Sequence, residues 1–190
     1  MNMRTVLSAD GRLRRAFTVA DVERMVEVGL IGPDERLEIV AGEILPMSPK
    51  GARHEALRVA LLEHLFDHRP PGLRIASEPG WRLGEALYLE PDLLLYPSAI
   101  PLDRLRGPDA LLVIEIADTT LGFDLGPKAA VYADQGVPEY WVIDAATRAT
   151  HIHRRPGAEG YGEVEVIGAE TQARAAGAGV SVMMGALAEG

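Results

Sequence analysis

One carboxylate stands in the middle of the most apolar stretch of the chain, Leu111–Asp118, which reads LLVIEIAD. Leucine, valine and isoleucine residues surround Glu115, so the stretch predicts a buried strand. A carboxylate in such a place loses its hydration, at a large free-energy cost, unless it meets a cation or hydrogen-bond donors. The chain must therefore fold so that a second element brings a partner to Glu115.

The bulk composition is that of an ordinary globular protein. The chain has 190 residues, of which 47% are hydrophobic and 25% charged, enough for one domain with a sizeable core. It has no cysteine, which excludes disulfides and thiolate zinc sites. The first residues contain no apolar segment typical of a signal peptide, and no apolar run could span a bilayer. We therefore expect a cytoplasmic protein without a membrane partner.

The first half of the chain predicts an arm, two helices and a hairpin. Residues 1–16 are polar and basic, and we expect a flexible arm there. Thr18 followed by Asp21 predicts a capped helix that begins near Val19. The segment 36–48 predicts a short hairpin with Gly42 in its turn, and 54–68 predicts an amphipathic helix.

The second half predicts a sheet that is covered on both faces. Strand-like runs lie at 73–78, at 81–89 leading into 91–97, at 110–118 and at 139–144. Between the last two we expect a short helix with Pro127 in its first turn and Gly136 just past its end. The tail alternates like an antiparallel hairpin. The sequence predicts an α/β fold over 17–190: a single domain with a mixed β-sheet flanked by helices and a C-terminal β-hairpin.

A second acidic residue opens the apolar run that precedes Glu115. Asp92 follows Pro91 directly in EPDLLLY, and two carboxylates on adjacent buried strands repel each other unless a cation lies between them. Mg²⁺ or Mn²⁺ would suit this site, because hard divalent cations take oxygen ligands and activate water for phosphodiester hydrolysis. A helix after Asp124 would bring Lys128 back toward the sheet, where an ammonium can orient water and stabilise charge on phosphate.

Together these residues resemble a known family. The stretches ERLEIVAGEILPMSPKGARHE, EPDLLLY and LLVIEIADTTLGFDLGPKAAVYADQGVPEYWVID, with the trailing hairpin, are similar to the Uma2 family of the PD-(D/E)xK nuclease superfamily, which has a restriction-endonuclease-like fold. The resemblance implies that Asp92 and Glu115 are the motif carboxylates and metal ligands. Ala117 stands where the motif has lysine, and Lys128 takes that role. Glu38 and His54 match further catalytic positions.

The resemblance implies a metal-dependent endonuclease that acts on nucleic acid, with DNA the expected substrate and a homodimer expected for cutting two strands. The net charge of −9 opposes non-specific attraction to nucleic acid. A catalytically silent module that binds nucleic acid or protein, or a hydrolase of smaller phosphoesters, stays open as an alternative. Each site residue also has a structural interpretation. Asp92 could simply start a strand, Glu115 could belong to a buried ion pair, and Lys128 could be a surface lysine. Glu38 could be a solvated hairpin residue, and His54 a polar residue at a helix start.

Overall fold

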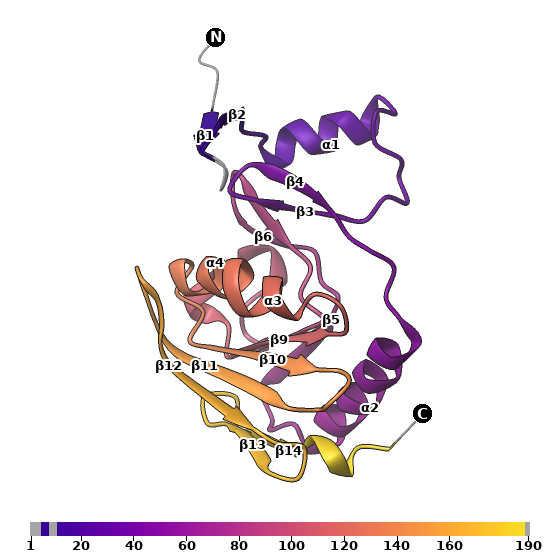
Figure 1. The fold of residues 1–190 in the computed structure, drawn as a ribbon, viewed down its shortest axis with the longest axis vertical. Coiled ribbons are helices and arrows are strands. Elements are labelled where there is room, and N and C mark those ends of the chain that lie inside the picture. The colour runs from indigo at the N-terminus through magenta and orange to yellow at the C-terminus, as the bar shows by residue number, and fades with distance from the viewer. Residues whose placement is uncertain (1–4, 8–10, 189–190) are drawn as a thin grey trace. The chain divides into compact units, whose positions relative to one another are not determined.

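The computed structural model describes residues 5–7 and 11–188. The chain divides into two compact units. Unit 1 consists of residues 1–49 and 80–90, and unit 2 of residues 50–79 and 91–190. Figure 1 follows the chain through both, and no helix of the described part is long and apolar enough to cross a membrane. The single domain expected over 17–190 stays a prediction.

Unit 1 begins with a small hairpin and a capped helix. Strands β1 (Thr5–Leu7) and β2 (Leu13–Arg15) pair antiparallel within the segment expected to be a flexible arm. The rest of that arm, 1–4 and 8–10, lies outside the described residues. Helix α1 (Val19–Glu27) begins at the capping box of Thr18 and Asp21, as the sequence predicts.

A four-stranded sheet completes unit 1, in the order β4-β3-β7-β6. The predicted hairpin is confirmed, because β3 (Leu37–Val40) and β4 (Glu43–Pro46) pair around Gly42, whose φ of +83° suits glycine. The expectation for 81–89 is wrong in one respect. This segment does not run on into the next strand but forms a hairpin, β6 (Trp81–Gly84) and β7 (Leu87–Leu89), that pairs with β3.

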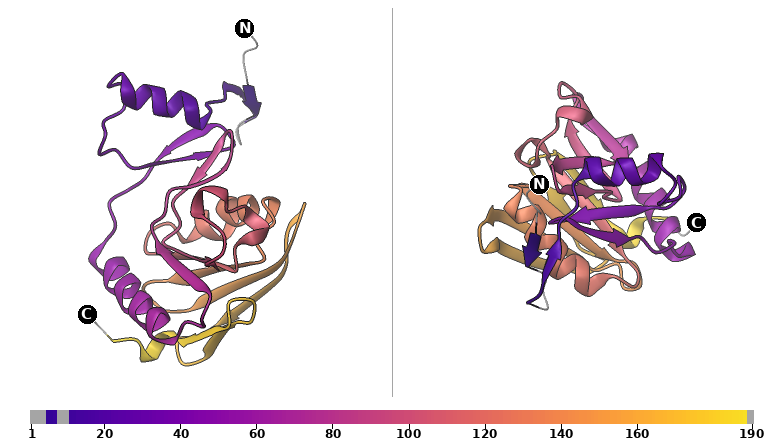
Figure 2. Two further views of the ribbon diagram at one scale, coloured as in Figure 1. Left: turned by 180° about the vertical axis from the view of Figure 1, so that it is seen from behind. Right: turned by 90° about the horizontal axis from the view of Figure 1, so that it is seen from above.

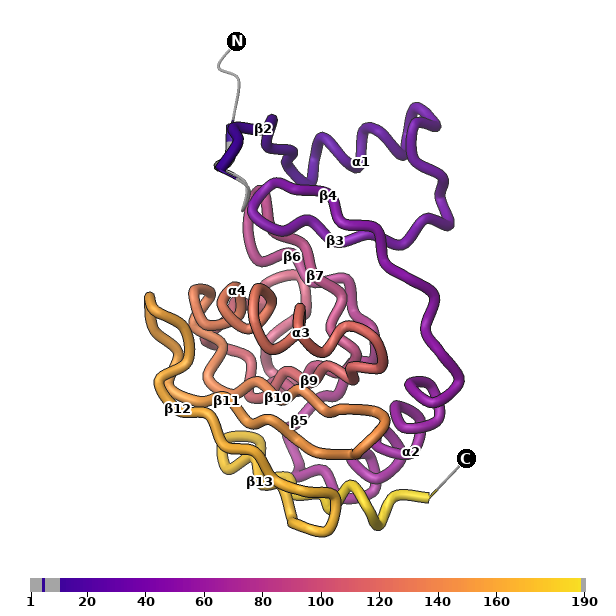
Figure 3. The backbone as a smooth tube through the Cα atoms, viewed as in Figure 1, coloured from indigo at the N-terminus to yellow at the C-terminus, as the bar shows by residue number. Residues whose placement is uncertain are grey.

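Unit 2 is built on a six-stranded mixed sheet, and the tube in Figure 3 follows its path. Only β9 and β10 are parallel; the other neighbours are antiparallel. In spatial order the strands are β12 (Gly160–Ile167), β11 (Thr150–Gly157), β10 (Glu139–Asp144), β9 (Leu112–Ala117), β8 (Leu93–Pro97) and β5 (Leu73–Ser77).

Helix α2 (Ala52–His68) and the hairpin of β13 (Gln172–Ala175) and β14 (Val180–Met183) cover one face of this sheet. Leucines spaced four apart along α2 pack there against inward residues of β8, β9 and β10, as the helical period requires. The shared core includes Leu57, Leu61, Leu65, Leu93, Leu95, Ile114, Ile116, Trp141 and Ile143.

The second helical segment covers the opposite face. It begins at Leu121, earlier than expected, and runs through α3 (Leu121–Phe123), a π-helical turn (Asp124–Lys128) and α4 (Ala129–Asp134). Pro127 therefore lies inside the helical segment, within the π-helical turn. Proline has no backbone N–H to donate to the helix, and the irregular hydrogen bonding of this turn accommodates it. Figure 2 shows the helices and the C-terminal hairpin of unit 2 around its sheet from two further sides.

Candidate active site

Asp92 and Glu115 occupy neighbouring positions at the junction of β8 and β9, on adjacent parts of the sheet. Leu93 lies opposite Ile114 in the antiparallel register, so Asp92 comes just before the strand, beside Glu115. The Oδ2 atom of Asp92 accepts a hydrogen bond of 2.7 Å from the backbone N–H of Ile116. Asp92 is 3% exposed and Glu115 5% exposed. Both carboxylates are therefore buried, and both need partners.

Glu115 finds its partners on the helical segment across the sheet face. The Nζ atom of Lys128 lies 2.9 Å from Oε1 of Glu115, and the hydroxyl of Tyr132 donates a 3.0 Å hydrogen bond to the same oxygen. Lys128 and Tyr132 are four residues apart and thus share one helix face. A cation and a hydroxyl together compensate the lost hydration of the carboxylate.

The π-helical turn ends at Lys128, the residue that immediately precedes α4. Lys128 is 5% exposed, against the surface position that is usual for lysine. π-Helical turns inside helices occur often at functional sites. The interpretation of Lys128 as an ordinary surface lysine is therefore wrong.

Asp92 is held by a histidine of α2 and a lysine just before that helix. The Nε2 atom of His54 lies 3.0 Å from Oδ2 of Asp92, and the ammonium of Lys50 contacts Oδ1. Burial alone would raise the pKa of Asp92, but the hydrogen bond and charge of His54, together with Lys50, lower it to about 2. Asp92 is therefore ionised at neutral pH.

A further acidic residue, Glu78, contacts Lys50 beside Asp92. Its Oε1 atom lies 2.5 Å from Nζ of Lys50, and its backbone N–H donates a 3.0 Å hydrogen bond to the carbonyl of Asp92. Glu78 has a φ of +50°, in the left-handed region that a residue with a side chain adopts at a cost. Glu78 thus combines an ion pair with Lys50 and a left-handed backbone.

The comparisons with known proteins bear on this constellation. The family model "Uma2: Putative restriction endonuclease" matches residues 19–183, which is most of the chain. This chain belongs to the Uma2 family. No curated protein matches it.

A solved structure supports the fold of this Uma2 chain. The chain is similar to the crystal structure of a putative nuclease belonging to DUF820 from Anabaena variabilis ATCC 29413, with a TM-score of 0.67 and 15% sequence identity. The match covers 89% of the Uma2 chain and 96% of the other. The family and the mixed α/β fold expected from the sequence are both confirmed.

Lys50 and Glu78 are the members of the site that the sequence did not predict. Both lie outside helices and strands, Lys50 before α2 and Glu78 after β5, where no hydrophobic period marks the residues that face the core. One signal was present in the Uma2 sequence: Lys50 lies just before the helix that carries His54 and Arg58, so basic and imidazole side chains gather near the start of that helix.

Glu38, the remaining predicted residue, lies on β3 in unit 1. It is buried, and its carboxylate accepts a 3.0 Å hydrogen bond from the backbone N–H of Glu90. The interpretation of Glu38 as a solvated hairpin residue is therefore wrong. Its catalytic role stays a prediction.

The donor set meets the needs of a divalent cation in part. Among the residues that the structure describes, no group of three or more His, Cys, Asp or Glu side chains is arranged to hold a metal ion. Asp92 and Glu115 nevertheless offer two hard oxygen donors, and Mg²⁺ in proteins is often bound by one or two carboxylates, with water and substrate phosphate completing the shell. Two carboxylates on adjacent strands are donor types that such a site uses, and metal binding here stays a prediction.

Proposed function

We propose that the chain is a divalent-metal-dependent endodeoxyribonuclease that hydrolyses phosphodiester bonds. The observation that carries the proposal is the buried pair of Glu115 and Lys128, beside an ionised Asp92 on the neighbouring strand. Two carboxylates and one lysine are the residue types that this hydrolysis uses for a metal, an attacking water and a developing charge. Membership of a family described as putative restriction endonucleases agrees with it.

Each residue has a distinct role in this proposal. Asp92 and Glu115 would hold Mg²⁺ or Mn²⁺, which supplies a more acidic water and neutralises phosphate charge when bound. Lys128 would orient the attacking water and stabilise the negative charge that develops on phosphate. His54 fixes the orientation of Asp92 through its 3.0 Å contact and is a positioning residue.

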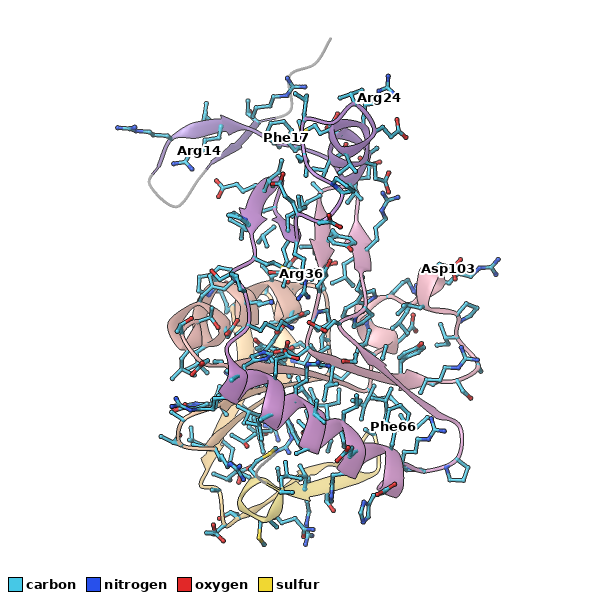
Figure 4. All side chains as sticks on the ribbon, turned by 90° about the vertical axis from the view of Figure 1, so that its right-hand side faces the viewer. Arg14, Phe17, Arg24, Arg36, Phe66 and Asp103 are labelled. Carbon is cyan, nitrogen blue, oxygen red and sulfur yellow. The ribbon has the colours of Figure 1, made fainter. Side chains whose placement is uncertain are left out.

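The distribution of charge supports nucleic acid as the substrate despite the acidic total. The first 16 residues contain four arginines and one aspartate, a net +3, which leaves −12 for the rest of the chain. Arg12, Arg14 and Arg15 are exposed on or beside β2, and Figure 4 labels Arg14 and the neighbouring Phe17. A basic N-terminal arm on an acidic protein is typical of contact with phosphate backbones.

The decisive experiment incubates the purified chain with supercoiled plasmid, single-stranded DNA, RNA and a small chromogenic phosphodiester. Each substrate is tested with Mg²⁺, with Mn²⁺ and with EDTA. Metal-dependent cutting of DNA that is lost in Asp92→Asn supports the proposal. Cutting that persists in EDTA, or in Asp92→Asn at the parent rate, would overturn it. Cutting of the small substrate alone would favour a hydrolase of smaller phosphoesters.

A catalytically silent module that binds nucleic acid or protein on the same fold is the second candidate. One observation favours it: both carboxylates already have a lysine partner, Lys128 at Glu115 and Lys50 at Asp92. Such a module would bind DNA equally well with Mg²⁺ and with EDTA and would not cut it.

A homodimer is proposed for the active enzyme, because cutting both strands uses two sites. Light scattering with and without DNA tests it.

A further inference from the structure

Lys50 stands out as a partly buried cation that the proposed chemistry does not use. Its ammonium contacts Oδ1 of Asp92 and lies 2.5 Å from Oε1 of Glu78. The side chain is only 13% exposed. A lysine held between two carboxylates in this way occupies the kind of place that a hard cation prefers.

The two oxygens of Asp92 have different partners, and this difference decides what a metal must displace. Oδ2 is taken by the backbone N–H of Ile116 and by His54, at 2.7 and 3.0 Å. Oδ1 is the atom that Lys50 contacts. A cation that binds Asp92 without breaking the link to β9 therefore uses Oδ1, where it lies close to the ammonium and is repelled by it.

Glu78 offers a place for the displaced ammonium. Its carboxylate already holds Lys50, and the backbone hydrogen bond to Asp92 keeps Glu78 in position whichever partner Lys50 takes. The left-handed φ of +50° at Glu78 indicates that the surrounding structure enforces this arrangement.

We propose that Lys50 is a built-in counter-ion that neutralises Asp92 in the metal-free protein and passes to Glu78 when a divalent cation binds. The inference rests on the proposed function, because it concerns the same metal site. It assigns Lys50 and Glu78 as positioning residues that set metal affinity. Lys50 would oppose the metal by charge repulsion, and Glu78 would favour it by holding the ammonium away.

The test is a calorimetric titration of Mn²⁺ into the full chain without DNA, so that turnover plays no part. Lys50→Met should bind Mn²⁺ about tenfold more tightly or better, because one positive charge leaves the immediate surroundings of the metal. Glu78→Gln should bind it more weakly than the parent. Arg58→Met is the matched control: it removes a cation from α2, the helix that follows Lys50, where Arg58 pairs with Glu55 and lies 3.9 Å from Glu78. Its affinity should change much less.

Equal shifts in Lys50→Met and Arg58→Met would reduce the effect to overall charge and overturn the proposal, as would unchanged or weaker binding by Lys50→Met. Binding by Lys50→Met alone, with none by the parent, would support it. If neither the parent nor any variant binds Mn²⁺, both this proposal and the metal-dependent function fail. If the parent binds Mn²⁺ and Lys50→Met binds it no more tightly, only this proposal fails. If Lys50→Met does not fold, the ammonium NMR signal of Lys50 in the parent should shift on adding Mg²⁺, and no shift would overturn the proposal.

Discussion

The Nζ atom of Lys128 lies 2.9 Å from Oε1 of Glu115, and both side chains are almost completely buried. This contact answers the question raised by a carboxylate in an apolar strand. It also changes the expected behaviour of Lys128 variants. A lysine at the exposed start of a helix contributes little stability, whereas one that compensates a buried carboxylate cannot be removed without leaving an unpaired charge.

We therefore expect Lys128→Ala to lose both turnover and stability. Turnover should fall by on the order of a hundredfold, as for the loss of a donor that stabilises transition-state charge. The free energy of unfolding without metal should fall by about 3–5 kcal/mol, because Glu115 stays buried without its cation. Thermal melts with EDTA and with Mg²⁺, together with plasmid cleavage, measure both effects.

Lys128→Arg and the pair of Glu115→Gln with Lys128→Met serve as controls for that prediction. Arginine keeps the charge but changes the reach, so partial recovery of turnover is expected. Removing charge from both partners should restore stability without restoring cleavage. If Lys128→Ala cuts DNA as fast as the parent, Lys128 is not catalytic, and His54 is the next residue to test.

The hairpin arginines should contribute to DNA affinity by binding phosphates. Replacing Arg12, Arg14 and Arg15 by glutamine should weaken DNA binding and make it less sensitive to salt. The slope of log affinity against log salt should fall by about 0.9 for each phosphate that the variant no longer neutralises. Arg155→Gln is the matched control, since Arg155 is 79% exposed and pairs with Glu163 at 3.2 Å. An unchanged slope in the triple variant would remove the hairpin from the interface.

His153 should make stability depend on pH. It is 5% exposed on β11, and burial lowers its pKa below the usual 6.5. The unfolded chain then takes up a proton at a higher pH than the folded chain. The contribution of neutral His153 to the free energy of unfolding is complete above about pH 6.5 and is lost as pH falls below that value. The free energy of unfolding then changes by at most about 1.4 kcal/mol per pH unit.

Urea unfolding of the parent and of His153→Gln between pH 5 and pH 8 isolates this contribution, because the other histidines are common to both proteins. The difference in unfolding free energy between the two should change below about pH 6.5 and stay constant above it. Parallel curves over the whole range would show that His153 titrates alike in the folded and unfolded states.

The sequence predicts the site residues where a charged side chain stands in or at the start of an apolar strand. Glu115 and Asp92 each interrupt or begin an apolar strand, and that conflict marks them without any knowledge of the fold. Lys50 and Glu78 lie outside helices and strands, where neither helical nor strand period constrains the side chain, so only the tertiary structure brings them to Asp92.

The fold shows the same division between local and non-local information. The α1 cap and the β3–β4 hairpin follow from short-range signals and are found as predicted. The 81–89 segment has the composition of a strand that continues into β8, yet it pairs with β3 instead. Pairing between distant segments is decided by packing, which the pattern of a single segment does not encode.

The left-handed backbone at Glu78 leads to a last prediction, which separates strain from charge. Glu78→Ala and Glu78→Gly remove the same carboxylate, but glycine adopts a φ of +50° without the Cβ penalty. Glu78→Gly should therefore be more stable than Glu78→Ala by about 1 kcal/mol, in spite of the greater flexibility of glycine in the unfolded chain. Ala41→Gly, at a φ of +49° beside Gly42 in the β3–β4 turn, is the matched control and should be at least as stable as the parent. Chemical unfolding of the four proteins gives the comparison. If Glu78→Ala equals or exceeds Glu78→Gly while Ala41→Gly behaves as expected, the backbone at Glu78 relaxes easily, and the ion pair with Lys50 alone holds the carboxylate in place.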